Sequence, residues 1–188
     1  MEGQLAEKVA CLECGKPVSV SLASRGEGLC LGCRAKRNPF FVLYSSLIGR
    51  VCHSPGGFDA LSDDEKLYYA LTLFQNEVNN GGFQQVFFNS SGSYYDLIEN
   101  GLVRFNEPRT LELLHQAKHI VFPEIAVPVD TRTRRDLMPA PAADLMNQLN
   151  ELDQRFYRCP DSLSAKLKAF ARQQGLVAAE TDDRQVRS

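Results

Sequence analysis

Four of the six cysteines fall into two pairs near the start of the chain. Cys11 and Cys14 have two residues between them, and so do Cys30 and Cys33, which follow fifteen residues later. This spacing lets both thiolates of a pair face one ion, and two pairs supply the four sulfur ligands of a tetrahedral zinc site. Because four protein ligands close the coordination sphere, we expect a structural zinc and not a catalytic one. An iron–sulfur centre is the alternative, since cysteine ligation alone does not exclude iron.

The segment around these cysteines is too small to fold on apolar burial alone. Residues 1–38 contain no Phe or Tyr, so metal binding must supply much of the folding free energy. Val18, Val20 and Leu22 alternate with other residues, which predicts one arm of a β-hairpin whose tip is the turn-rich stretch 24–28. We therefore predict a zinc-ribbon or rubredoxin-like knuckle.

The knuckle carries a local net charge of +2, which could contact phosphate. No aromatic side chain lies between its basic residues, as stacking on bases would require. We therefore interpret residues 34–37 as a solvated linker and do not expect direct binding to nucleic acid.

A second group of polar side chains surrounds a Gly–Gly pair in the middle of the chain. The candidate binding residues are Glu77, Asn79, Asn80, Gly81, Gly82, Phe83, Gln84, Gln85 and Asn89. Amides donate and accept hydrogen bonds but have no useful pKa, so they suit recognition better than proton transfer. We expect this region to bind a protein partner. The alternative is an enzyme site built on Glu77, Asn80 and Gln84.

Few other residues have the spacing of a metal-binding or catalytic motif. His115 and His119 are four residues apart on a predicted helix and could face one metal ion, but no neighbouring Glu or Cys completes a ligand set. The sequence contains no nucleophile elbow, phosphate-binding loop or zinc-protease motif. We therefore assign no catalytic residue and expect a non-enzymatic protein.

Residues 39–178 are predicted to form an all-α domain that positions the amide-rich region. Asn38 followed by Pro39 predicts a helix start, and Ser62 with Glu65 predicts a capping box. The glycine pair should end or bend the helix that begins there. Helices are expected over residues 39–53, 62–80, 94–105, 108–122, 141–157 and 163–174, with a short amphipathic segment over 83–88. Four prolines predict a long surface loop over 123–141.

Two stretches of this domain resemble a known family. The first runs from Glu77 to Gln85 and continues in Phe88-Asn89-Ser90-Ser91-Gly92; the second runs from Leu149 to Tyr157. Both are similar to motifs of the DNA-mimic protein 19 family, which is largely a bacterial domain of unknown function. The resemblance covers about residues 59–176, so the knuckle lies outside it.

The resemblance implies an all-α domain and, for the family's best-known member, a dimer whose acidic surface imitates DNA and occupies a transcription factor. Residues 57–100 contain seven acidic residues and one lysine, a local net charge of −6. Acids at a helix N-terminus also favour the helix dipole, which is the ordinary explanation for part of this charge. Acidic mimicry that inhibits a DNA-binding protein is therefore an alternative to recognition through the amides.

The whole chain has the composition of a globular protein. Its 188 residues carry a net charge of −2, with 44% hydrophobic and 23% charged residues. No apolar run is long enough to span a bilayer and no leader pattern is evident, so we expect a cytoplasmic protein with reduced thiols. The expected organisation is a knuckle over 1–38, a helical domain over 39–178 and a disordered tail over 179–188, with a homodimer possible.

Overall fold

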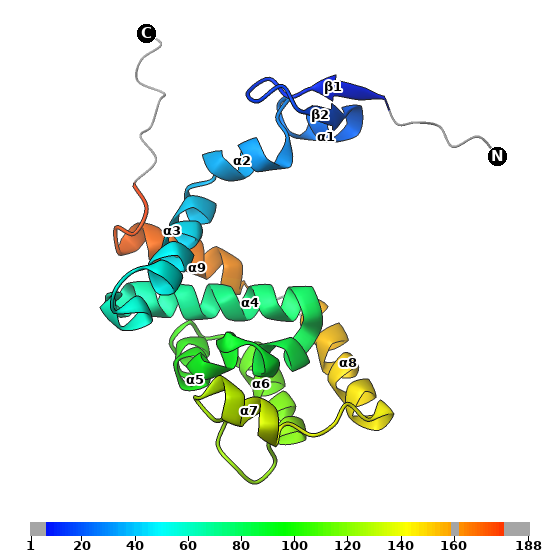
Figure 1. Ribbon diagram of the computed structural model, residues 1–188, viewed down its shortest axis with the longest axis vertical. Helices are drawn as coiled ribbons and strands as arrows, with labels where there is room; N and C mark the ends of the chain where they lie inside the picture. Colours follow the sequence, from blue (N-terminus) through cyan, green and yellow to red (C-terminus); the bar gives the residue numbers. More distant parts are fainter. Residues whose placement is uncertain (1–6, 159–161, 179–188) are drawn as a thin grey trace, which may run out of the picture.

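The structure is a computed structural model that describes residues 7–158 and 162–178. The fold is mainly α, with a small two-stranded antiparallel hairpin at its beginning (Figure 1), which confirms the predicted fold class. The predicted disordered tail lies outside the described residues. Within those residues, none of the helices combines the length and the hydropathy needed to cross a membrane.

The elements follow one another with short connections. The strands are β1 (Lys8–Ala10) and β2 (Pro17–Ser19), and the short 3₁₀ helices are η1 (Gly57–Ala60) and η2 (Ser90–Tyr94). The α-helices are α1 (Val20–Arg25), α2 (Leu31–Arg37), α3 (Pro39–His53), α4 (Asp63–Phe88), α5 (Tyr95–Arg104), α6 (Pro108–Val121), α7 (Thr131–Leu137), α8 (Ala143–Tyr157) and α9 (Leu163–Gln173).

The knuckle contains more helix than its sequence pattern suggested. β1 and β2 pair antiparallel on either side of the first cysteine pair, with Val9 opposite Val18. Val20 and Leu22, expected in a hairpin arm, belong to α1, so the alternation is interrupted after Val18. Residues 34–37 are likewise part of α2 and not a linker. The second cysteine pair thus lies at the start of a helix, and the first lies in the hairpin turn.

The helical domain is built around α4, which crosses its middle in Figure 1 and contacts α3, α5, α8 and α9. Its buried face includes Leu71, Phe74, Val78 and Phe87, each with no exposed surface. The knuckle has a separate small core of Cys11, Val18, Ala23, Leu29 and Cys33. The contact of α2 with α3 is the main link between the two parts.

The predicted helix starts are confirmed at atomic level. The Asn38 side chain accepts hydrogen bonds from the backbone N–H groups of Phe40 and Phe41. Ser62 and Glu65 form a complete capping box at the start of α4. These interactions satisfy donors that a helix start leaves without intrahelical partners.

The surface loop predicted over residues 123–141 is only partly a loop. Its middle folds into α7, which begins behind an Asp130 cap that accepts from the Thr133 N–H. Arg134 of α7 is completely buried, although arginine is among the residues least often found inside proteins. The structure therefore corrects the prediction for this segment, and the reason lies in the contacts of Arg134.

Candidate metal centre and the broken helix

The sulfur atoms of the four paired cysteines cluster in the knuckle. The Sγ atoms of Cys11, Cys14, Cys30 and Cys33 all lie within 4.8 Å of one another. Cys14 Sγ and Cys30 Sγ are 3.7 Å apart. A tetrahedron with metal–sulfur bonds of about 2.3 Å places its sulfurs about 3.8 Å from each other, so the cluster has the dimensions of a four-thiolate site. The four cysteines could therefore hold one metal ion.

Backbone N–H groups support negative charge on these sulfurs. Cys30 N donates to Cys11 Sγ at 3.2 Å, and Cys33 N donates to Cys30 Sγ at 3.4 Å. The N–H groups of Cys30, Cys14 and Glu13 lower the pKa of the Cys11 thiol to about 6. Burial raises the pKa of Cys33 in the absence of an ion. A bound cation favours the thiolate form of each of its ligands and would offset the effect of burial on Cys33.

The glycine pair breaks α4 into two helical segments. Gly81 has φ −151° and ψ 20°, and Gly82 has φ 74° and ψ −173°, a conformation that is almost exclusive to glycine. A Cβ at Gly82 would also clash with the carboxylate of Asp153. The predicted bend is confirmed, and Gly82 is the residue that the backbone requires.

Helix α8 holds the two segments together at this break. Asp153 Oδ1 accepts from the Phe83 N–H at 2.8 Å, which caps the second segment, and Tyr157 Oη donates to the Val78 carbonyl at 2.9 Å, which closes the first. The Phe156 ring packs edge-on against Phe83 with centroids 6.0 Å apart. Asp153 and Tyr157 are not among the predicted site residues, although both lie in the second stretch that resembles the family.

The polar side chains of the break form one network. Glu77 Oε2 accepts from the Gln85 amide and from Asn89 Nδ2, the latter at 2.9 Å. Asn80 Nδ2 points to Gln85 Oε1 at 3.4 Å, and Asn79 Nδ2 donates to a backbone carbonyl of its own helix. Much of the amide chemistry is thus used within the protein.

The predicted binding residues divide by exposure. Asn79, Asn80 and Gly81 are exposed; Glu77, Gln84, Gln85 and Asn89 are half-buried; Gly82 and Phe83 are buried. The Phe83 ring lies 6.2 Å from that of Phe74 in the core, where no partner reaches it. A partner at this place would contact the exposed amides and not Phe83.

Arg134 joins the end of α4 to the segment that precedes α7. Its guanidinium nitrogens donate to the carbonyls of Phe87, Asn89, Pro128 and Val129 and to the hydroxyls of Ser93 and Thr131. Carbonyls at a helix C-terminus have no intrahelical donors and carry partial negative charge, which offsets the cost of burying a cation. A Cβ at Gly92 would lie 2.5 Å from Arg134 Nε, so glycine makes room for this side chain.

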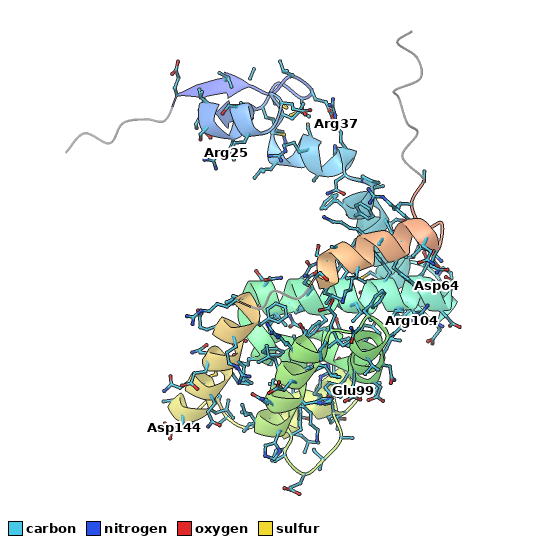
Figure 2. All side chains as sticks on the ribbon, turned by 180° about the vertical axis from the view of Figure 1, so that it is seen from behind. Arg25, Arg37, Asp64, Glu99, Arg104 and Asp144 are labelled. Carbon is cyan, nitrogen blue, oxygen red and sulfur yellow. The ribbon has the colours of Figure 1, made fainter. Side chains whose placement is uncertain are left out.

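Several acids of the −6 segment are already paired. Asp64 lies 3.9 Å from Arg104, Glu65 is engaged by Arg50, and Glu99 lies 2.6 Å from His115 Nε2. Figure 2 shows Asp64 beside Arg104, with Glu99 on a different part of the surface. Asp59, Asp63 and Asp96 are exposed and have no ion pair within the described ranges. The acids are therefore scattered and partly neutralised.

The histidine pair does not assemble a second metal site. His115 bonds to Glu99, while His119 is exposed. In the part of the chain that the structure describes, the four-cysteine cluster is the one group of three or more His, Cys, Asp or Glu with ligand geometry.

Comparison with known proteins agrees with the resemblance. A family model described as DMP19-like protein matches residues 59–174, from η1 to the end of α9. No curated protein and no solved structure matches the chain. The match contains both motifs and α7, and it leaves out the knuckle and α3.

Proposed function

The chain belongs to the DMP19-like family, and from that premise we propose that it is a non-enzymatic, zinc-binding protein whose helical domain binds a protein partner. In this proposal residues 1–38 are a structural zinc module, residues 39–178 are the recognition domain, and the protein acts in the cytoplasm.

The observation that carries the metal assignment is the clustering of four sulfur atoms within 4.8 Å. We assign zinc because a closed set of four thiolates suits that ion, which has no redox chemistry and prefers tetrahedral coordination. The ligands are Cys11, Cys14, Cys30 and Cys33. With all four positions taken by protein, the ion stabilises the knuckle and is not available to a substrate.

The recognition role rests on the exposed amides at the helix break. Asn79 and Asn80 stand on a rigid support, because α8 fixes the break through Asp153 and Tyr157. Glu77, the carboxylate nearest to them in sequence, is occupied by two amide donors. This arrangement favours hydrogen bonding to a partner over proton transfer.

The test begins with identification of the partner by chemical cross-linking and affinity capture from the native host. Asn80→Ala should then weaken binding of the purified partner by several-fold, because hydrogen bonds at an interface are worth about 0.5–1.5 kcal/mol each. Asn106→Ala, an exposed amide remote from the break, is the matched control. Equal affinity of Asn80→Ala and the parent would refute the amide surface.

Acidic mimicry of DNA is the second candidate, favoured by family membership and by the unpaired Asp59, Asp63 and Asp96. A mimic binds through screened charge, so affinity for its partner should fall steeply between 0.1 M and 1 M salt, as the Debye length shortens from about 10 Å to 3 Å. Neutralising Asp63, Asp64 and Glu65 should weaken binding, and DNA should compete. Weak salt dependence without competition would favour the amide surface.

A further inference from the structure

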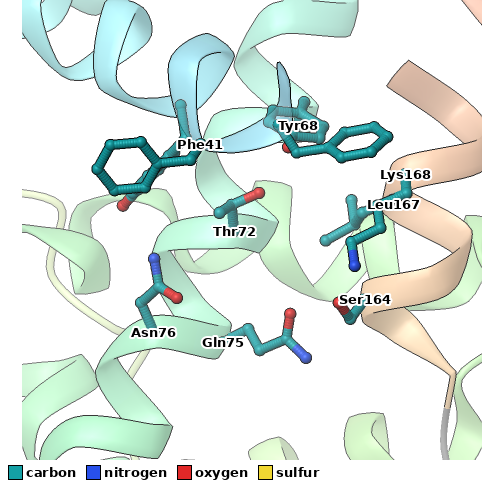
Figure 3. Close-up of a pocket in the computed structure, with 10 residues that line it drawn as sticks. Phe41, Tyr68, Thr72, Gln75, Asn76, Ser164, Leu167 and Lys168 are labelled. Atoms are coloured by element: carbon teal, nitrogen blue, oxygen red, sulfur yellow. The ribbon is translucent and has the colours of Figure 1, made fainter. Parts of the chain in front are cut away.

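A groove outside both proposed sites lies where α3 crosses α4 and α9. It is lined by Phe40, Phe41, Tyr44, Tyr68, Thr72, Gln75, Asn76, Ser164, Leu167 and Lys168, and its volume is about 200 Å³. Figure 3 shows Thr72 in the middle, between Phe41 on one side and Leu167, Ser164 and Lys168 of α9 on the other. The α3 wall precedes the family-matched region, so part of this groove lies outside the family match.

The floor of the groove combines apolar rings with polar side chains of α4. Thr72 Oγ1 is inaccessible to solvent, so this hydroxyl is not available to an occupant. Gln75 and Asn76 also line the groove, and their amides can donate and accept hydrogen bonds.

The apolar wall is incompletely covered. Phe41 and Val42 of α3 are each 49% exposed, and within α3 only Leu47 is fully buried. Phe41 lines the groove, and an exposed aromatic side chain in a groove wall is typical of surfaces that bind another molecule.

The charge around the groove has one sign. None of its ten lining residues is acidic, and Lys168 has no ion pair in the described part of the chain. Lys168 Nζ lies 5.8 Å from the centre of the Phe40 ring, and the Arg172 guanidinium lies 5.0 Å from it. Lys168 therefore places a cation beside the aromatic wall, which complements a carboxylate next to an apolar group.

The size of the groove selects the kind of occupant. A volume of about 200 Å³ is below the roughly 300–1,000 Å³ of small-molecule sites but accommodates one large side chain. We propose that this groove binds an acidic peptide segment of a partner protein, with an aromatic side chain between α3 and α9 and a neighbouring Asp or Glu carboxylate at Lys168. This inference rests on the proposed protein-binding function, and it locates a second contact surface away from the exposed amides.

The test uses blocked tetrapeptides. N-acetyl-Gly-Trp-Glu-Gly-amide is titrated against the full chain, and its tryptophan fluorescence reports binding because the protein has no Trp. Titration to about 10 mM detects a Kd on the order of 1 mM. The Gln analogue should bind about two- to fivefold more weakly, as expected for loss of one exposed ion pair, and the analogue with Ala in place of Trp should not compete.

Variants locate the binding. Lys168→Gln should abolish the preference for Glu over Gln, whereas Lys118→Gln on α6 should preserve it. Ser164→Phe fills the groove from its exposed rim and should prevent binding, while Ala165→Phe, at the next exposed position of α9, should bind like the parent. Melting temperatures of both Phe variants confirm that they are folded.

The results that would contradict this proposal can be distinguished from one another. No saturable binding, equal affinity for the Glu and Gln peptides, or binding that survives Ser164→Phe would overturn the proposal. Tighter binding of N-acetyl-tryptophan with a free carboxylate would assign the groove to a chain terminus. A parent dimer that Ser164→Phe dissociates would assign it to a second copy. If peptides fail while a captured partner still depends on Asn80, this inference falls and the proposed function stands.

Discussion

Arg134 uses all three guanidinium nitrogens to bind oxygens of α4, η2 and the segment leading into α7. Its neighbour Arg135 is exposed, donates to the Phe88 carbonyl and lies over the Phe88 ring at 4.3 Å. Consecutive arginines therefore experience very different environments, and only the first is a structural requirement of the fold.

Arg134→Met should lower the free energy of unfolding by about 3 kcal/mol or more, because buried carbonyls lose their donors together. Arg135→Met is the matched control and should cost less than about 1 kcal/mol, the scale of an exposed cation–π contact. Urea denaturation followed by circular dichroism measures both. Similar losses in the two variants would contradict the structural role of Arg134.

Gly82 and Gly81 are also adjacent in the chain, and only Gly82 has a backbone conformation that requires glycine. Gly82→Ala should lower stability by about 1–3 kcal/mol, since alanine at φ 74° and ψ −173° is strained and its Cβ clashes with Asp153. A Cβ at Gly81 would meet the movable amide end of Gln85 and lie 3.2 Å from Gln85 Cβ, so Gly81→Ala should cost less than Gly82→Ala, about 1 kcal/mol at most. Thermal melts of the two variants that coincide would show that the break is merely flexible.

At the scale of elements, the break in α4 and the inner face of α8 form one unit. The carboxylate of Asp153 and the hydroxyl of Tyr157 satisfy backbone groups on opposite sides of the break, and Phe156 fills the space between them. Both family motifs therefore meet in space. Their side chains are explained to a large extent by this internal role, and the exposed amides and the α3 groove are the surfaces that we propose for recognition.

The charge on Asp153 gives the break a pH dependence. Burial raises the pKa of this carboxyl, and the Phe83 N–H offsets part of the rise. A raised pKa in the folded state means that the protonated form is favoured by folding, so the stability it contributes is lost as pH rises through the folded pKa. Asp153→Asn keeps an acceptor for Phe83 and removes the buried charge.

We therefore expect Asp153→Asn to be at least as stable as the parent at pH 7, with any advantage shrinking as pH falls toward the ordinary Asp range. Asp153→Ala removes the cap and should cost about 1 kcal/mol at pH 7, and this cost should grow on acidification, because the parent gains stability as the Asp153 carboxyl is protonated. Chemical denaturation of the parent and of both variants at pH 7 and pH 4.5 measures these differences in the free energy of unfolding. An advantage of Asn that grows on acidification would contradict the burial argument.

At the scale of the whole molecule, two separate cores suggest two units of stability. The knuckle core contains Cys11 and Cys33 themselves, so its packing depends on the ligands being held together. The larger core extends from Leu47 to Val177 and includes no knuckle residue. We propose that the knuckle folds with its metal, while the helical domain folds without it.

Purified protein should then carry about one zinc per chain by elemental analysis. Cys14→Ser should release the ion and unfold the knuckle, leaving the helical signal and the melting temperature of the larger core nearly unchanged. Cys52→Ser, which replaces an exposed cysteine outside the cluster, is the matched control and should keep the zinc. A reduced preparation that contains neither zinc nor iron would refute the metal site.

The sequence by itself determined the features that depend on neighbours in the chain. The Cys-x-x-Cys spacings predicted the sulfur cluster, Asn38-Pro39 and Ser62-x-x-Glu65 predicted helix starts, and the glycine pair predicted the bend. Each of these predictions depends on backbone geometry within a few residues or on the spacing of cysteines along the chain. The family resemblance added that residues 149–157 belong with the glycine pair, without saying how.

Only the tertiary structure decided the features whose causes are distant in the chain. Arg134 is buried because carbonyls of Phe87 and Asn89, more than forty residues away, accept its hydrogen bonds, so no local pattern could separate it from Arg135. Asp153 caps Phe83 across seventy residues, and the Phe83 ring is buried against Phe74 of α4 and Phe156 of α8. The alternation that predicted a strand through Leu22 failed because α1 packs against β1 and β2. Local spacing specifies caps, bends and ligand pairs, whereas burial of a charged or aromatic side chain depends on partners that the fold supplies.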